Sequence, residues 1–122
     1  MLLGRHEAGR MAVVEAGFPM VVPVNFKMVS GDDDNVVFVV STRHDGPLGR
    51  ATRACLQIDA FDSYHREGWS VMVQATVEAG DAPPVDSWVA GRDLLLVLRP
   101  VTVAGRRLHA HPLDLPNLGA YL

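Results

Sequence analysis

Three arginines with the chemistry to hold a phosphate lie within eleven residues of one another. Arg43, Arg50 and Arg53 follow directly on Ser41 and Thr42. A loop that enters a helix offers free backbone N–H groups and a positive dipole end to an anion. Arginine adds bidentate, charge-assisted hydrogen bonds. The stretch therefore predicts a phosphate site. A solvated helix face is the alternative for this cluster. Ten of the eleven cations in the chain are arginine, and the base composition of the gene can produce that bias without any role in binding.

The histidines and acidic residues do not form a metal-ligand set. No Asp, Glu or Cys stands at a supporting spacing from the five histidines, so we expect no metal site. A haem needs one axial histidine, and His44 and His65 stay open for that role. Asp32–Asp34 lacks the downstream glutamate of a calcium loop and predicts a solvated hairpin tip. Cys55 has no activating neighbour in the sequence and is expected to be a small core residue.

Length, charge and cysteine content exclude several classes of protein. The chain of 122 residues predicts a single domain, residues 1–122. One cysteine excludes an internal disulfide framework. A net charge of −3 disfavours nucleic-acid binding, which needs a basic surface. No apolar run approaches the roughly 20 residues of a membrane span, and the first residues do not form a signal peptide. We therefore expect a soluble cytoplasmic domain without a membrane partner.

The elements that must position these residues are mainly strands. Eighteen valines favour a half-buried pleated sheet. Pro23 cannot donate to a neighbouring strand, so either a sheet edge or an opening of the ladder is expected there. The runs with strand character are 10–15, 20–29, 36–40, 55–61, 69–79 and 94–103, the last broken at Pro100. The end of a helix is expected over 1–9, short helices over 50–54 and 85–90, and an irregular arm from Gly105. Six short strands with small helices predict an antiparallel barrel.

Five motifs occur in an order that resembles a known family. The motifs are Gly9-Arg10-Met11-Ala12-Val13-Val14, Val22-Pro23-Val24-Asn25-Phe26, Val37-Phe38-Val39-Val40-Ser41, Gly68-Trp69-Ser70-Val71-Met72-Val73 and Val103-Ala104-Gly105-Arg106-Arg107. They resemble the pyridoxamine 5′-phosphate oxidase-like split β-barrel proteins, in particular the short actinobacterial-type members. The resemblance runs from residue 9 to residue 107 and implies a homodimer with flavin sites at the subunit interface.

The resemblance also implies roles for particular residues. It implies that Pro23, Val24 and Asn25 line the flavin ring, and that Trp69 and Ser70 border it. The segment after the third strand would hold the phosphate, with Ser41, Thr42, Arg43 and Arg50 as candidates. Where many relatives have a hydroxyl residue and a lysine, this chain has Gly46-Pro47-Leu48. The arginines are therefore expected to supply the charge, and Trp69 and Asn25 are expected to border one cleft, with either residue able to come from the partner.

Each of these residues has a simpler interpretation. Asn25 can be a strand-edge amide that faces solvent, Trp69 a core or interface plug, and Ser70 a turn residue. The function that follows from the resemblance is an FMN- or deazaflavin (F-420)-dependent oxidoreductase acting on a small molecule, with no catalytic side chain assigned. The alternative is a non-enzymatic dimeric barrel that binds haem or no cofactor.

Overall fold

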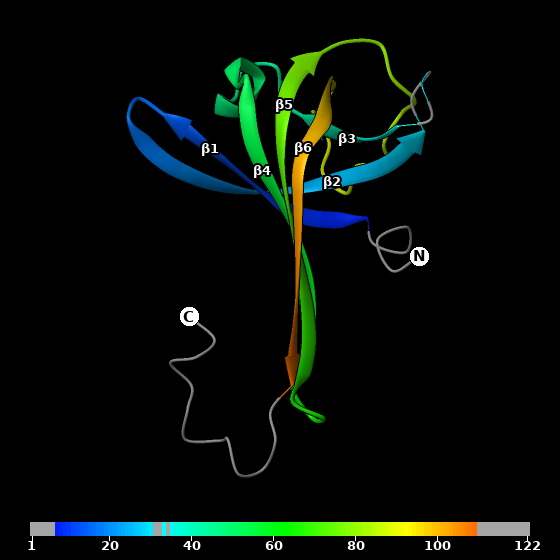
Figure 1. The fold of residues 1–122 in the computed structure, drawn as a ribbon. Helices are drawn as coiled ribbons and strands as arrows, with labels where there is room; N and C mark the ends of the chain where they lie inside the picture. The colour runs from blue at the N-terminus through cyan, green and yellow to red at the C-terminus, as the bar shows by residue number, and fades with distance from the viewer. Residues whose placement is uncertain (1–6, 31–32, 34, 110–122) are drawn as a thin grey trace.

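The strands of the chain form one closed antiparallel barrel. The computed structural model describes residues 7–30, 33 and 35–109. The elements in this part are β1 (Ala8–Glu15), β2 (Phe18–Ser30), β3 (Val36–Thr42), the 3-10 turn η2 (Pro47–Arg50), β4 (Arg53–Asp62), β5 (Glu67–Ala79) and β6 (Leu94–His109). Their order around the barrel is β1-β2-β3-β6-β5-β4 (Figure 1). The mainly β, six-stranded antiparallel barrel is confirmed. Among the described residues, no helix is long and apolar enough to cross a membrane.

The barrel interior is built from alternate residues of the strands. Successive side chains of a strand point to opposite faces, so each strand contributes every second residue. Val24 and Phe26 of β2 are buried in the core, and the ring of Phe26 lies 6.0 Å from that of Phe38 on β3. Each fully buried apolar side chain of this size stabilises the fold by about 1.5–3 kcal/mol. Asn25, between these two core residues, therefore lies on the outer face.

The closure of the barrel between β1 and β4 is short. Arg10–Ala12 pairs with Cys55–Gln57, and the two strands diverge on either side. A Cβ atom on Gly9 would lie 2.8 Å from the backbone oxygen of Gln57, so the approach of the strands requires a glycine there. At Pro23, β2 still pairs with β1, whereas its pairing with β3 ends at Asn25. The expected opening of the ladder at Pro23 is confirmed.

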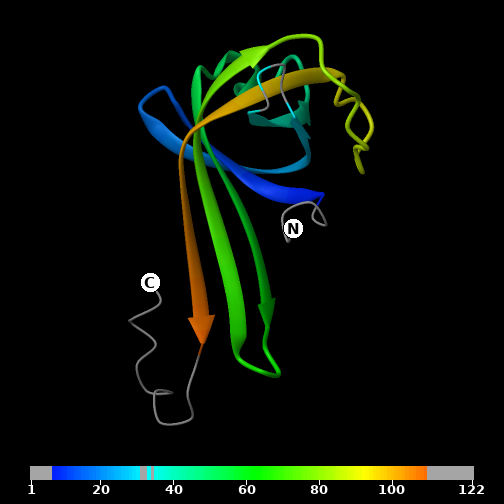
Figure 2. The same ribbon diagram turned by 45° about the vertical axis from the view of Figure 1, so that its right-hand side comes forward.

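Three strands continue beyond the barrel as an arm (residues 59–70 and 106–109). Strand pairing continues from the barrel to Asp62–Glu67 between β4 and β5, and to Glu67–His109 between β5 and β6. Figures 1 and 2 show these halves of the strands running together away from the other strands. The irregular arm predicted from Gly105 is therefore wrong up to His109, because these residues pair with β5. Residues 110–122 lie outside the described part.

The break predicted at Pro100 is a β-bulge, and the last strand continues beyond it to His109. Ala75 pairs with Pro100 and Gln74 with Thr102, so that Val101 is an extra residue in β6. A bulge of this kind absorbs a residue that cannot donate to the ladder while the strand continues.

The predicted helices are wrong within the described residues. Residues 1–6 of the first lie outside the description, but Ala8 and Gly9 belong to β1 because Ala8 pairs with Asn25. In place of the helix at 50–54, η2 ends at Arg50 and β4 begins at Arg53, which pairs with Thr76. Pairing with β5 supplies more backbone hydrogen bonds than one isolated helical turn, which is costly to nucleate.

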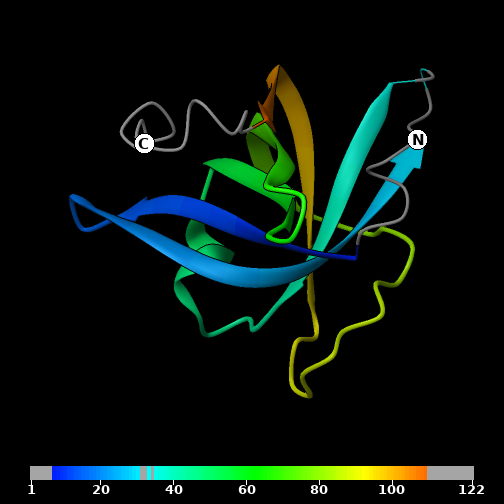
Figure 3. The same cartoon turned by 90° about the horizontal axis from the view of Figure 1, so that it is seen from below.

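The third helix, predicted over 85–90, is replaced by an irregular strap (residues 80–93) between β5 and β6. The backbone N–H of Trp88 donates to the side chain of Asn25 rather than to a helical carbonyl. Figure 3 shows the strap passing outside β2 and β3. Val37, Val39 and Val97 are buried on this outer face, apart from the core cluster. The strap therefore covers a second, smaller apolar layer.

Candidate functional site

Asn25 and Ser41 face each other on the outer face, where the pairing of β2 with β3 ends. They are direct partners in the pairing of β2 with β3, and Ser41 is also the partner of Leu95 on β6. Asn25 is 3% exposed and Ser41 is 1% exposed. Both polar side chains therefore lie away from water, where each hydrogen-bonding group needs a partner in the protein or in a ligand.

The amide of Asn25 joins three parts of the chain. Its Nδ2 donates to the backbone oxygen of Glu7 at 3.2 Å, and its Oδ1 accepts the backbone N–H of Trp88 at 3.0 Å. A solvent-facing amide at a strand edge is therefore excluded. Asn25 holds the segment before β1 and the strap against β2. Glu7 and Trp88 could not be predicted as partners of Asn25, because both bonds use the backbone of residues far away in the chain.

The hydroxyl of Ser41 has no hydrogen-bond partner among the described residues, although its oxygen is buried. An unpaired buried hydroxyl costs about 1–3 kcal/mol of stability. A natural protein keeps such a group where a ligand, ion or water satisfies it. Ser41 is therefore the strongest sign of a ligand on this face.

Asn25 and Ser41 form a polar row on the outer face. Among the described residues, few hydrogen bonds attach the strap over this row. The Gly80 N–H donates to the backbone oxygen of Leu95 at 3.4 Å, and the His44 ring pairs with Asp93 at 3.2 Å. The latter pair lowers the pKa of Asp93, because His44 hydrogen-bonds the carboxylate. A hollow of about 400 Å³ remains between the strap and the sheet, and its lining is Val29, Ser30, Asp33, Val37, Val39, Asp81, Ala82, Pro83, Val97 and Arg99. The strap therefore lies loosely on its layer.

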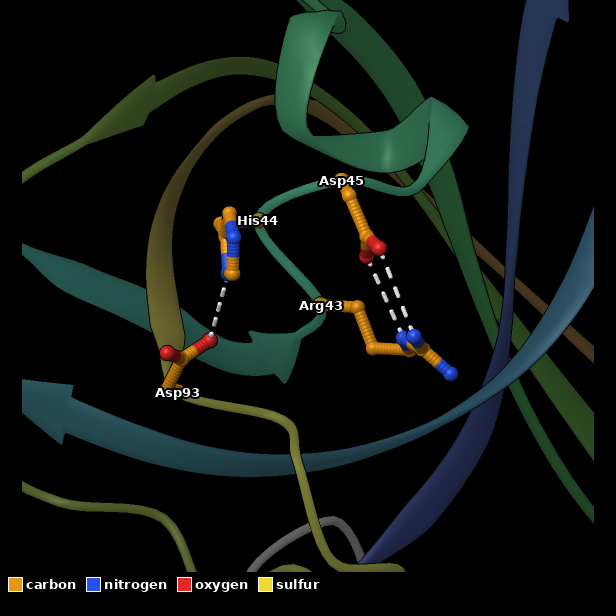
Figure 4. A network of polar contacts seen from close by, with 4 residues as sticks. All are labelled: Arg43, His44, Asp45 and Asp93. Atoms are coloured by element: carbon orange, nitrogen blue, oxygen red, sulfur yellow. Dashed lines mark hydrogen bonds and ion pairs between the residues drawn. The ribbon is translucent and has the colours of Figure 1, made fainter.

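The two arginines predicted to hold a phosphate are exposed and paired with carboxylates. Arg43 donates through Nε and an Nη atom to Asp45 at 3.2 and 3.3 Å (Figure 4). This pairing lowers the pKa of Asp45. Arg50 donates to Glu15 of β1. Exposed pairs of this kind contribute about 0–1 kcal/mol, so a phosphate could replace either carboxylate at little cost. Thr42 is buried at the end of β3 beside this loop.

Trp69 and Ser70 lie on the arm. Trp69 is half-buried, packs against the edge of the core, and pairs with Ala60 and Arg107. The Oγ atom of Ser70 accepts a hydrogen bond from Nε2 of Gln57 at 3.2 Å, so it is not a turn residue. The shared cleft of Trp69 and Asn25 stays a prediction.

A single chain thus divides the nine predicted site residues into three groups. The first is the strand segment Pro23, Val24 and Asn25 with its neighbours Ser41 and Thr42; the second is Arg43 and Arg50; the third is Trp69 and Ser70. Val24 is buried in the core and Pro23 is exposed. None of the nine lines the hollow beside the strap, the groove between Met28 and Val103 or the groove between Val13 and Thr76. Arg53 lines one of these grooves, where β1 and β4 diverge.

The remaining polar residues form local pairs. His65 lies 2.6 Å from the Asp62 carboxylate in the turn at the tip of the arm, which raises the pKa of His65 and lowers that of Asp62. Within residues 7–30, 33 and 35–109, no group of three or more His, Cys, Asp or Glu lies close enough to hold a metal ion. Cys55 is half-buried in β4.

This geometry defines a class of protein, a small split barrel whose outer face carries the covered polar row of Asn25 and Ser41. The sequence profile of the family described as pyridoxamine 5′-phosphate oxidase matches residues 1–107. The chain belongs to this family, and the resemblance noted in the sequence is confirmed. No curated protein matches the chain.

Solved structures agree in fold. The FAD-binding protein of Mycobacterium smegmatis is 19% identical with a TM-score of 0.66, and the match covers 87% of each chain. A Corynebacterium glutamicum protein, provisionally described as a pyridoxamine 5′-phosphate oxidase, is 20% identical with a TM-score of 0.70 over 90% of this chain and 87% of that one. A FAD-binding protein of Mesorhizobium loti is 18% identical with a TM-score of 0.65 over 88% and 89%. At these identities the likeness establishes the fold.

Proposed function

We propose that the protein binds a flavin on the outer face of β2 and β3 and is a flavin-dependent oxidoreductase for a small molecule. The observation that carries the proposal is the buried, unpaired hydroxyl of Ser41, directly opposite Asn25. Family membership supports it, as does the FAD-binding description of two structural neighbours. We take FMN as the cofactor, with F-420 as the alternative, because the phosphate candidates suit both.

The described residues fit a phosphorylated flavin in two respects. Ser41 offers a hydroxyl that has no partner, and Arg43 and Arg50 offer guanidinium groups that only exposed carboxylates now engage. A bound flavin supplies hydride chemistry, whereas the protein orients the ring and excludes water. In this scheme Asn25 and Ser41 orient a ring edge, the arginines neutralise the phosphate, and the second apolar layer excludes water.

We also propose that the protein is a homodimer and that each arm reaches the partner's site. Large apolar side chains are exposed along the barrel and at the end of the arm; they include Val14, Phe18, Val21, Phe61, Val101 and Val103. Apolar surface of this extent is typical of an interface. A twofold partner would cover it and would bring Trp69 and Ser70 of one chain towards Asn25 of the other. Light scattering that showed a monomer at micromolar concentration would contradict this arrangement.

A second candidate function is haem binding without catalysis. The observation in its favour is a structural neighbour described as a FAD- and haem-binding protein of Mycobacterium smegmatis, 15% identical with a TM-score of 0.62 over 97% of this chain and 75% of that chain. His44 and His65 are the candidate axial ligands, although each ring now pairs with a carboxylate.

The test that separates these functions is a titration of the purified protein with FMN, F-420 and haemin. We expect FMN to bind, and Arg43→Ala to weaken that binding by about 10- to 100-fold, because a charge-assisted hydrogen bond is worth about 1.5–3 kcal/mol. Riboflavin has no phosphate and should bind the wild type and the variant equally. Binding of haemin with no binding of either flavin would replace the flavin proposal with the second candidate.

A further inference from the structure

The strap occupies the polar row to which the proposed function assigns the flavin. Oδ1 of Asn25 is already engaged by the Trp88 N–H, and Asn25 is 3% exposed. A ligand therefore cannot reach this amide oxygen while the strap is in place. Ser41 is the direct strand partner of Asn25 and is itself 1% exposed, so a ligand that reaches both side chains must take the place of the strap at Asn25.

We propose that the strap is an autoinhibitory gate whose Trp88 N–H stands in for a ring N–H of the ligand, and that the ligand displaces it from Asn25. This inference rests on the proposed flavin site. The matching ligand edge carries an N–H beside a carbonyl oxygen. The N–H would donate to Oδ1 of Asn25, and the carbonyl would accept from the Ser41 hydroxyl. The pyrimidine portion of a flavin has such an edge.

Three features of the strap suit a gate. It contains no helix or strand, so leaving the sheet breaks no ladder. Among the described residues, its hydrogen bonds to neighbouring elements are the Asn25 bond, the long Gly80 bond to Leu95 and the His44–Asp93 pair, which is exposed and contributes only about 0–1 kcal/mol. The hollow of about 400 Å³ beside Asp81–Pro83 shows that the first residues of the strap pack incompletely against the apolar layer. Segments with few buried contacts and exposed hydrogen bonds are those that open locally.

The side chain of Trp88 has little part in the closed state. It is 68% exposed, whereas the backbone N–H of the same residue makes the buried contact. The N–H and the side chain can therefore be removed separately. Trp88→Pro deletes the N–H, and Trp88→Ala keeps the N–H while deleting the indole, which makes it the matched control.

The first test compares the affinity of these two variants for FMN. We expect Trp88→Pro to bind FMN about 2- to 12-fold more tightly than Trp88→Ala, because one neutral hydrogen bond no longer competes with the ligand. Trp88→Ala should bind like the wild type. Equal affinity of the two variants would overturn the gate and leave the flavin site standing. Absence of FMN binding by the wild type and by both variants would overturn the proposed function and the gate with it.

The second test uses the unmodified protein and so does not depend on how the proline variant folds. Amide exchange followed by NMR reports the Trp88 N–H directly. We expect FMN to accelerate exchange at Trp88, while the N–H of Val77, bonded to the Thr52 oxygen at 2.9 Å, stays protected as the internal control. If FMN binds and the Trp88 N–H remains as protected as before, the strap does not open and the gate is refuted.

Discussion

Removing the hydroxyl of Ser41 should stabilise the ligand-free protein, contrary to the usual effect of a core truncation. The oxygen is buried and has no partner in the part of the chain that the structure describes, and such a group costs about 1–3 kcal/mol. The void left by one oxygen atom takes back part of that gain. We therefore expect Ser41→Ala to raise the free energy of unfolding by about 1 kcal/mol. For a chain of this size that is a rise in melting temperature of roughly 3–6 °C.

The assay is thermal or urea unfolding of flavin-free protein, with Ser70→Ala as the matched control. Ser70 is also a strand serine, but its hydroxyl accepts a hydrogen bond from Gln57. Loss of that bond should lower stability slightly, by up to about 1 kcal/mol. The same Ser41→Ala variant should bind FMN about 2- to 12-fold more weakly than the wild type. A Ser41→Ala variant that is less stable than the wild type and binds FMN unchanged would refute the reasoning.

Three further predictions concern other parts of the molecule. Gly9→Ala should destabilise the barrel by about 1–3 kcal/mol in urea unfolding, because its Cβ would lie 2.8 Å from a backbone oxygen of β4. Gly80→Ala, which meets nothing within 4 Å, should change stability by less than about 0.5 kcal/mol; equal effects would contradict the close approach. Arg50→Ala should weaken FMN binding by about 10- to 100-fold and leave riboflavin binding unchanged, and an equal loss for both would show that Arg50 does not contact the phosphate. By NMR titration, the pKa of His65 should lie above 6.5 in the wild type and return towards that value in Asp62→Asn. The contribution of the pair to stability is therefore present below pH 6.5 and is lost as the pH rises through the raised pKa. An unchanged pKa of His65 in the variant would exclude Asp62 as the cause.

The strands were predictable because the alternation of apolar and polar residues is a local property of the sequence. Runs such as Leu56–Asp59 alternate apolar and polar residues, and burial follows that alternation in the barrel. The predictions of short helices were wrong because the residues that pair with these segments lie far away in the sequence. Arg53 joins β4 because it pairs with Thr76, and Trp88 is drawn out of a helix by Asn25. Local propensity does not contain either partner.

The sequence pointed to residues for the candidate site, whose role stays a prediction, but it did not predict their hydrogen bonds. The resemblance pointed to Asn25 and Ser41, and the register makes them direct neighbours. Burial on an outer face was not predictable, because the covering strap has no periodic pattern and its hydrogen bonds use the backbone. The carboxylate partners of the arginines were missed for a related reason. Glu15 lies 35 residues before Arg50, and only closure of the barrel brings them together.

The central claim is that the protein binds a flavin. Its most direct test is a titration of FMN with the purified, flavin-free protein, in which the fluorescence of the flavin is measured at each step. The account predicts a saturable change with one flavin bound per chain, as expected when the ring leaves water for the face formed by β2 and β3. FMN fluorescence that stays unchanged at every protein concentration, together with unchanged absorbance of F-420 in a parallel titration, would contradict it.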